Sequence, residues 1–503
     1  MAEQSRRPPR QRDPDTDEPK DAQKAQPRPG SATFDAKIRI APAADILDEW
    51  EPIVVRARRR TIGRTNGAWV LIFGFAAIIL IGTVLLKLPW AVQPGHTLSW
   101  SDAFFTSTSA TTVTGLAVVN TANDFTRFGQ IVILLLLQVG GVGFIAFSVL
   151  LFRLIGRRVN LQTRFIVQQS LGTKEGSGVL DLALYVLGVT LAIEAVGAFL
   201  LWLRWRTTLP DGEALWYAVF HAISSYCNAG FDLFSGTDRG VLFGYGADGY
   251  TLAVMGALIL VGGFGITVLY DLWSYPAHRS LGLNTRFTLV LTVLLTAIGL
   301  GVILSDMSFH QEIVHDLPAG QRLAVGLFTI VSARTAGLTI LPLAELGQAT
   351  QLLIVMWMFI GGSPASMAGG VSTSALAVLL AAVLATARGH RTAITFHRTL
   401  PTETIAKAVA IMTVSTLLVV GMTLILALRN QGDIFTVGFE VVSAFANAGY
   451  TLDFTPQLDT FGRYLIAFTM FWGRLGPLTI VFALTQSEQP TLVRYPEEPV
   501  IMG

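Results

Sequence analysis

Four short turns of small residues, each ending in glycine, carry the residue types that could do chemistry. They end at Gly115, Gly230, Gly337 and Gly449, which are 107 to 115 residues apart, so the chain contains an internal repeat. Extended backbone can turn carbonyl oxygens inward to replace the hydration shell of a permeating cation, and glycine permits close approach and a positive φ. The pattern predicts a backbone-carbonyl filter, whereas the alternative is four ordinary structural turns. The predicted filter residues are Thr112, Val113, Thr114, Gly115, Cys227, Asn228, Ala229, Gly230, Thr335, Ala336, Gly337, Asn447, Ala448 and Gly449.

A short apolar run precedes each turn. These runs cover about residues 103–110, 215–225, 323–333 and 434–446. They are too short to cross a bilayer, which takes about 20 residues. Such segments are tolerated at membrane depth when they are buried in protein or line water, so we expect four re-entrant pore helices. The C-terminal end of each helix, with its partial negative charge, would then favour a cation at the turn.

Eight longer apolar stretches flank these runs and predict membrane spans. The sixth contains Gly361, Gly362, Ser363, Pro364, Ser366, Gly369 and Gly370, so we expect it to be broken inside the membrane. The predicted stretches are residues 68–88, 130–151, 182–202, 252–273, 287–304, 352–384, 408–428 and 464–484.

The composition agrees with a membrane protein. Of 503 residues, 52% are hydrophobic and 14% are charged, against roughly 25% charged in soluble proteins. The mean hydropathy is +0.55. The polar first ~45 residues lack the features of a cleavable signal peptide and indicate a disordered tail. A single cysteine, Cys227, excludes an internal disulfide and a cysteine metal cluster, and a small side chain beside the filter is a better interpretation than a reactive thiol.

Basic segments follow every second span and predict the orientation. Residues 56–60, 153–164 and 388–398 are rich in arginine, with a weaker cluster at 278–286. By the positive-inside rule both termini are expected to be cytoplasmic, although these segments could equally face a soluble partner. The predicted fold is an all-α polytopic membrane protein with four parallel span–pore helix–span repeats, which means eight transmembrane helices and four re-entrant helices around a pseudo-fourfold axis. The expected divisions are residues 1–50 (cytoplasmic tail), 51–165, 166–285, 286–395 (with an intramembrane gating loop), 396–487 and 488–503 (cytoplasmic tail).

A second glycine-rich mark lies within the second span of each repeat. It begins at Gly140, Gly262, Gly361 and Gly473 and predicts close helix packing. In the fourth repeat Arg474 interrupts it. A charge at membrane depth costs at least about 2.5–3.5 kcal/mol on insertion scales, so it usually has a function and a partner. Arg474 is either a positive barrier opposite the broken helix or half of a helix-locking salt bridge with Glu194 or Glu440.

Other acidic residues have simpler interpretations. Glu440 is expected to make a buried hydrogen bond that braces the fourth turn, and Glu194 is expected to have a structural partner. Asp232 and Asp453 either concentrate cations at the mouth or are ordinary loop carboxylates.

The chain resembles the Trk/Ktr/HKT superfamily of potassium transporters, and within it the Ktr-type membrane subunit. The resemblance covers about residues 66–484 and rests on residues 109–116, 224–231, 334–337, 361–364 with 368–370, and 473–479. It implies K⁺ uptake, a homodimer, a cytoplasmic ring of nucleotide-binding regulatory subunits, and a gate at the broken helix. The predicted gate residues are Gly361, Gly362, Ser363, Pro364, Ser366, Gly369, Gly370 and Arg474.

Competing functions are weighed against K⁺ uptake down the electrochemical gradient. A Na⁺-preferring or Na⁺-coupled transporter of the same fold stays open, but by resemblance serine rather than Gly115 would indicate sodium preference. An intramembrane enzyme would need clustered acidic or histidine side chains, and the seven histidines are scattered. An organic-solute symporter would be expected to have inverted rather than parallel repeats. We expect no enzyme activity, no nucleotide on this chain and no nucleic acid partner, with K⁺ at the filter residues as the one bound metal.

Overall fold

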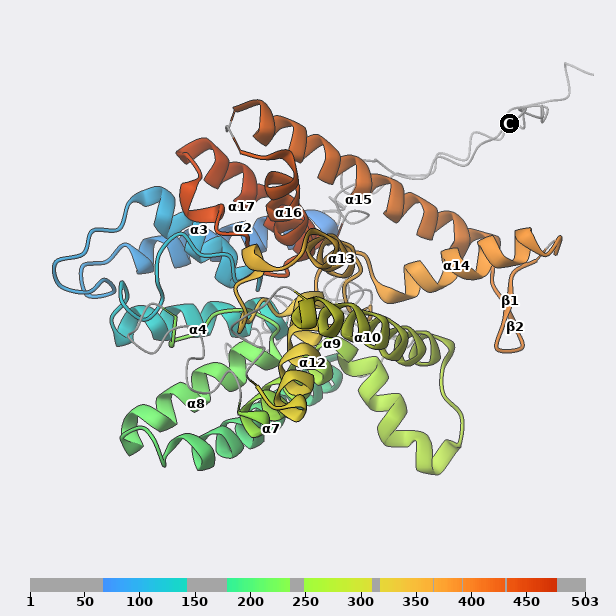
Figure 1. The fold of residues 1–503 in the computed structure, drawn as a ribbon, viewed down its shortest axis with the longest axis horizontal. Helices are drawn as coiled ribbons and strands as arrows, with labels where there is room; N and C mark the ends of the chain where they lie inside the picture. The colour runs from blue at the N-terminus through green and yellow to red at the C-terminus, as the bar shows by residue number, and fades with distance from the viewer. Residues whose placement is uncertain are drawn as a thin grey trace, which may run out of the picture. The chain divides into compact units, whose positions relative to one another are not determined.

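The described part of the computed structural model is almost wholly helical. It comprises residues 67–142, 179–235, 248–309, 317–364, 366–390, 392–429 and 432–476 (Figure 1). Both predicted tails, the basic segments 56–60 and 153–164, and the far ends of the second and eighth predicted spans lie outside these residues. The helices are α2 (Gly67–Leu86), α3 (Trp100–Thr111), α4 (Arg127–Val142), α7 (Val179–Trp205), α8 (Asp211–Tyr226), α9 (Gly249–His278), α10 (Leu283–Phe309), α12 (Ala319–Thr335), α13 (Gln348–Phe359), α14 (Thr373–Ala387), α15 (Thr402–Arg429), α16 (Ile434–Ala446) and α17 (Thr460–Leu475), with 3-10 turns at Leu343–Glu345 and Thr455–Gln457.

The four short helices are present as α3, α8, α12 and α16. α16 has the predicted bounds, and the other three begin three or four residues earlier than predicted. The reason is that the first turns of these three helices contain polar residues, whereas the predicted bounds follow the apolar residues alone. In α3 the Ser99 hydroxyl accepts from the Asp102 N–H while the Asp102 carboxylate accepts from the Ser99 N–H, a capping box that starts the helix at Trp100.

Four of the described helices are long and apolar enough to cross a membrane. They contain the spans Leu184–Trp205, Gly249–Ala277, Leu283–Met307 and Thr402–Arg429. The sixth predicted stretch is interrupted as expected, because α13 ends at Phe359 and α14 begins at Thr373. A total of eight spans stays a prediction.

Two of the predicted spans have a break in their helical geometry. α17 ends at Leu475, where Gly476 has a φ of 83°, and the rest of the eighth predicted stretch lies outside the described residues. Pro477 explains this in part, since a residue before proline is disfavoured in helical conformation. α9 is likewise kinked at Gly265, whose φ is 72°. Both breaks lie in the second glycine mark.

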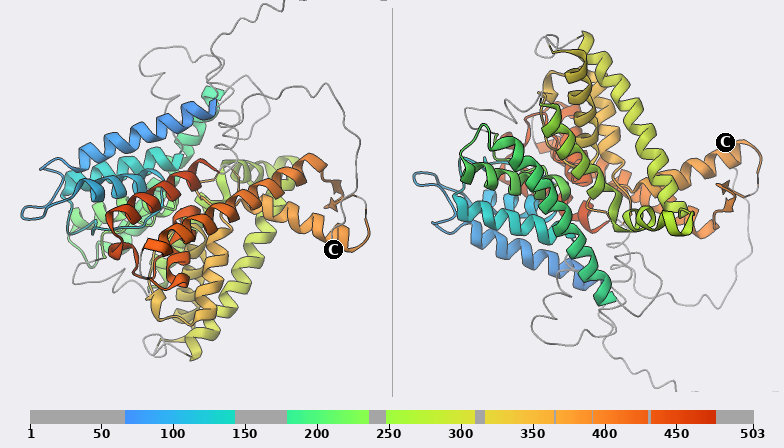
Figure 2. Two further views of the ribbon diagram at one scale, coloured as in Figure 1. Left: turned by 90° about the horizontal axis from the view of Figure 1, so that it is seen from above. Right: turned by 90° about the horizontal axis from the view of Figure 1, so that it is seen from below.

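A small hairpin departs from the all-α prediction. Strands β1 (Ile394–Thr395) and β2 (Arg398–Thr399) pair antiparallel, with Ile394 opposite Thr399. Both views in Figure 2 place the hairpin beyond the adjoining ends of α14 and α15. It connects two helices that pack against each other.

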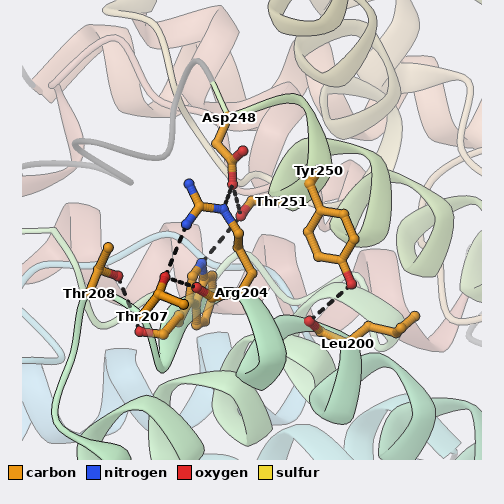
Figure 3. Close-up of polar contacts among 8 residues, drawn as sticks. Leu200, Arg204, Thr207, Thr208, Asp248, Tyr250 and Thr251 are labelled. Carbon is orange, nitrogen blue, oxygen red and sulfur yellow. Dashed lines mark hydrogen bonds and ion pairs between the residues drawn. The ribbon is translucent and has the colours of Figure 1, made fainter.

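The end of α7 is fastened to the start of α9 by polar contacts (Figure 3). The Arg204 Nε lies 3.0 Å from the Asp248 Oδ2, which also accepts from the Thr251 hydroxyl at 2.7 Å. The Tyr250 hydroxyl donates to the Leu200 carbonyl at 3.2 Å. These bonds fix the two long helices on either side of α8.

The short helices are linked through contacts that close on themselves. Each packs against the helix before it and the helix after it: α3 with α2 and α4, α8 with α7 and α9, α12 with α10 and α13, and α16 with α15 and α17. Each short helix also contacts the helix that follows the previous short helix: α8 contacts α4, α12 contacts α9, α16 contacts α13, and α3 contacts α17. The circuit returns to its start, so the four short helices and their turns occupy the interior of the described residues.

Candidate functional site

The four turn glycines form a closed ring. All four have positive φ, between 66° and 91°. A Cβ built on Gly115 would lie 2.6 Å from the Ala229 carbonyl oxygen, and one on Gly230 would lie 2.7 Å from that of Ala336. On Gly337 it would meet the Ala448 carbonyl, and on Gly449 the Thr114 carbonyl, still more closely. Each glycine thus faces the carbonyl of the next turn, and we call Gly115, Gly230, Gly337 and Gly449 the glycine ring.

Three of the turns share one backbone construction. Val113, Asn228 and Asn447, each two residues before a ring glycine, are left-handed with φ of 51° to 58°. The residue after each of them donates its N–H back to a serine carbonyl five residues earlier: Thr114 to Ser109 (2.8 Å), Ala229 to Ser224 (2.8 Å) and Ala448 to Ser443 (2.9 Å). This is the 6→1 bond of a helix C-terminal motif, and it ends each helix in the direction of the ring.

The third turn is one residue shorter. Its serine, Ser332, lies five residues before Gly337, whereas the other serines lie six residues before their glycines. The N–H groups of both Ala336 and Gly337 donate to the Ser332 carbonyl, and Ala336 has a φ of −109°. The third turn therefore reaches the ring without a left-handed residue before its glycine.

Serine hydroxyls fasten three of the turns, a role that the sequence interpretation missed. The Ser109 Oγ accepts from the Gly115 N–H at 3.1 Å. The Ser224 and Ser332 hydroxyls donate to the carbonyls of Phe231 (2.6 Å) and Leu338 (2.8 Å), one residue after the ring glycines. A serine five or six residues before each glycine was the available signal.

Side chains of the predicted filter residues are buried and connect neighbouring turns. The Thr112 and Thr114 hydroxyls are 2.7 Å apart, and the Asn447 amide donates to the Thr114 hydroxyl at 2.9 Å. The fourth turn is thereby joined to the first. The buried residues of this set are Thr112, Val113, Thr114, Cys227, Asn228, Ala229, Thr335, Ala336, Gly337, Asn447, Ala448 and Gly449.

The second glycine mark places helices against the short-helix ends. A Cβ on Gly140, Gly262 or Gly473 would strike the carbonyl oxygen of the residue that ends, or nearly ends, the short helix before it. Those residues are Thr111, Tyr226 and Phe445 respectively. In the third repeat a Cβ on Gly361 would strike the Gly369 carbonyl instead, within the same segment. Close packing is confirmed for this mark, but the third repeat achieves it differently.

The interrupted segment, residues 361–370, folds back on itself and lies between several helices. The Gly361 N–H donates to the Val371 carbonyl at 2.9 Å, and Ile360 and Val371 form an isolated parallel bridge. The N–H groups of Ser363 and Met367 donate to the Gly263 and Gly262 carbonyls, at the kink of α9. At the far end, a Cβ on Gly369 would meet the Ala446 carbonyl at 2.6 Å, beside the fourth turn.

Arg474 contacts this segment through backbone carbonyls. Its guanidinium donates to the Met367 carbonyl and, on the other side, to the carbonyls of Gly140 and Gly141 in α4. The salt bridge suggested for it is wrong, since neither Glu194 nor Glu440 is an ion-pair partner of Arg474 within the described residues. Carbonyl dipoles replace a carboxylate here.

The two buried glutamates have other partners. The Glu194 carboxylate accepts from the Gln138 amide at 2.6 Å and from the Cys227 thiol at 3.7 Å, so its expected structural partners are confirmed. The Glu440 Oε1 accepts from the Thr451 hydroxyl and from the N–H (2.8 Å) and hydroxyl (2.6 Å) of Thr455. Because both threonines follow the fourth turn, the predicted buried hydrogen bonding of Glu440 is also confirmed.

The loop carboxylates differ from each other. Asp232 accepts from the N–H groups of Phe234 (2.7 Å) and Ser235 (2.6 Å), a local turn that favours an ordinary loop role. Asp453 is exposed, and its role at the mouth stays a prediction.

Comparisons with known proteins agree on one family. Residues 61–495 match the family model described as TrkH, cation transport protein. The chain is 37% identical over 435 residues to the Ktr system potassium uptake protein B of Bacillus subtilis, covering 86% of this chain and 96% of the relative. It is 32% identical over 452 residues to the potassium/sodium uptake protein NtpJ of Enterococcus hirae, covering 89% of this chain and 99% of the relative.

A solved structure shares the fold. The crystal structure of the potassium transporter TrkH from Vibrio parahaemolyticus superposes with a TM-score of 0.67 over 86% of this chain and 87% of that chain, at 18% identity. At this identity the likeness shows the fold alone, which is that of an all-helical membrane protein. Family model, relatives and fold together show that the chain belongs to the TrkH cation transport family, as a membrane subunit of the Trk/Ktr superfamily of potassium transporters.

Proposed function

We propose that this chain takes up K⁺ across the cytoplasmic membrane, and that the ion passes through the glycine ring. The closed ring is the observation that carries the proposal. Four turns with positive-φ glycines surround one point, and four helices end within two to four residues of them. Backbone carbonyls and helix C-termini are the groups that replace water around an alkali cation and favour positive charge.

The four turns belong, in this proposal, to four parallel repeats around a pseudo-fourfold axis. The order of contacts α4–α8, α9–α12, α13–α16 and α17–α3 supports such an arrangement. The repeats would occupy residues 51–165, 166–285, 286–395 and 396–487, between cytoplasmic tails at 1–50 and 488–503. Membrane potential drives uptake without ATP, since one charge crossing 100 mV releases about 2.3 kcal/mol.

Residues 361–370 act as the gate, together with Arg474. The segment contacts the fourth turn through Gly369, and Arg474 holds Met367. A fixed cation at this depth repels K⁺, and movement of the segment away from the path opens it. Such a movement breaks a few backbone hydrogen bonds to the α9 kink and leaves helices α13 and α14 intact.

A homodimer and a cytoplasmic regulatory ring that binds nucleotide complete the proposal. The name Ktr system of one relative supports a separate subunit. Residues 388–398, which include the first strand of the β1–β2 hairpin and the start of the second, form a basic segment that could dock such a subunit.

Sodium is the alternative ion, because the Enterococcus hirae relative is named for both potassium and sodium. Flux of ⁸⁶Rb⁺ and ²²Na⁺ into proteoliposomes of purified protein decides between them, with and without a Na⁺ gradient. We expect Rb⁺ flux to exceed Na⁺ flux and Gly115→Ser to reduce that preference. Equal fluxes in wild type, or four ring-glycine variants with unchanged selectivity and rate, would rule out the filter.

A further inference from the structure

Arg334 occupies a special register position in the third repeat. Counted from the turn serines, it corresponds to Thr111, Tyr226 and Phe445. In the other three repeats those residues present a backbone carbonyl to a glycine of the second mark. In the third repeat the relation is reversed, because the Arg334 side chain donates to the carbonyl of the corresponding glycine, Gly361, at 3.1 Å.

The contacts of Arg334 are few and directional. Its other terminal nitrogen donates to the Thr292 hydroxyl of α10 at 3.1 Å. The residue is only 6% exposed, and no carboxylate among the described residues pairs with it. A buried guanidinium is costly unless it is hydrogen-bonded, and its place in the last turn of α12 lets the helix dipole stabilise the charge.

Gly361 is the neck of the interrupted segment. It lies beside the Ile360–Val371 bridge and its N–H is bonded to Val371, so both ends of the segment meet there. Arg334 therefore holds the neck, whereas Arg474 holds Met367, farther along the segment. Two arginines from different helices, α12 and α17, thus donate to two different residues of the segment.

Arg334 is also next to the filter. It immediately precedes Thr335, Ala336 and Gly337 in the turn that is one residue shorter than the others. That turn has a 6→1 bond, from the Gly337 N–H to the Ser332 carbonyl at 3.2 Å, but it lacks the left-handed residue that precedes the glycine in the other three. Its position must consequently depend more on what the end of α12 is attached to.

We propose that Arg334 is a selectivity-determining positioning residue that fixes the third filter turn by anchoring it to the neck at Gly361 and to Thr292. This inference rests on the proposed function and deepens it. The neck stays fixed to the filter while the part of the segment held by Arg474 moves. Loss of the Arg334 contacts lets Gly337 shift relative to the other ring glycines, which changes the spacing of the carbonyls around the ion.

The test compares Arg334→Gln, Arg334→Lys and Thr292→Val with wild type in proteoliposomes, measuring the ratio of ⁸⁶Rb⁺ to ²²Na⁺ flux. We expect Arg334→Gln to lower the ratio about tenfold, corresponding to about 1.4 kcal/mol. Arg334→Lys should recover part of the ratio, since an ammonium can reach one of the two acceptors but cannot reproduce the planar fork. Thr292→Val, which removes one acceptor, should lower the ratio by a smaller factor.

Arg322→Gln is the matched control, because Arg322 lies near the other end of α12 and donates to the Leu317 carbonyl. Its ratio should equal that of wild type. A folded Arg334→Gln protein with the wild-type ratio overturns the inference, and if that variant does not fold, a wild-type ratio in Thr292→Val overturns it. Failure of the proposed function would be distinct, because it would appear as equal Rb⁺ and Na⁺ flux in the wild-type protein itself.

Discussion

The glycine ring and the interrupted segment at residues 361–370 are built from the same residue type in different ways. In the ring, each glycine faces a neighbouring carbonyl so closely that no side chain fits without movement. In the segment, Gly361 and Gly369 are packed just as closely against carbonyls, but hydrogen bonds from the side chains of Arg334 and Arg474 and a few bonds to α9 also hold it in place. The ring is closed by contacts among its own turns, whereas the segment is also held by arginine side chains of other helices, whose hydrogen bonds can be released.

This difference separates a rigid part from a movable one. Close-packed backbone cannot shift without a large cost, because interiors are as dense as crystals. A hydrogen bond to a charged donor contributes only about 1.5–3 kcal/mol and can be exchanged for water or another acceptor. The ring therefore suits selection among ions, and the segment suits opening and closing.

Replacing a ring glycine should have the largest effect. In Gly337→Ala the Cβ would strike the Ala448 carbonyl at a residue whose φ is 66°. Strain at positive φ and overpacking each cost about 1–3 kcal/mol, so a combined penalty of about 3 kcal/mol predicts roughly a hundredfold loss of K⁺ uptake. Complementation of a strain that lacks other potassium systems measures it.

Gly301→Ala on α10 serves as the control for that prediction. A Cβ there meets nothing within 4 Å, and alanine is the better helix former. Uptake should stay at the wild-type rate. Equal loss in both variants would mean that any glycine replacement harms the protein and that the ring is not special.

Releasing the segment should raise ion flux, whereas replacing a ring glycine should lower it. Arg474→Ala removes the bond to Met367 together with those to Gly140 and Gly141, and deletion of residues 363–370 removes the segment itself. Both should raise Rb⁺ flux, by about tenfold if one charged hydrogen bond is lost, and weaken regulation. Arg429→Ala, which breaks an exposed ion pair with Asp459, should leave flux unchanged. A deletion variant that inserts normally and conducts no faster would make the segment a packing element.

The smallest effect is expected behind the fourth turn. Glu440→Gln keeps an acceptor oxygen for Thr451 and Thr455 but replaces a charged acceptor by a neutral one, at a cost of about 1 kcal/mol. The apparent K⁺ affinity in uptake assays should fall about fivefold. In Glu440→Ala all three donors lose their acceptor, so the apparent K⁺ affinity should fall further. Wild-type affinity in both variants would show that steric packing alone holds this turn.

The sequence by itself determined the local features. Glycine spacing identified the four turns, apolar run length identified the short helices, and the glycine-rich run at 361–370 marked the broken stretch. These signals are local, because turn conformation and helix breaking depend on residues within about one helical turn. The starts of α3, α8 and α12 were placed three or four residues too late, since their first turns contain polar residues.

Tertiary structure decided how these pieces are joined. The partners of Arg474 lie 107 and 334 residues away in the chain, and an expected carboxylate partner turned out to be a set of carbonyls. The third turn is one residue shorter than the others in the sequence itself. This difference could be recognised only from the serine contacts, which show how the four turns align. Backbone carbonyls carry no sequence signature, since every residue has one. A site built from them becomes visible only when distant segments are brought together in space.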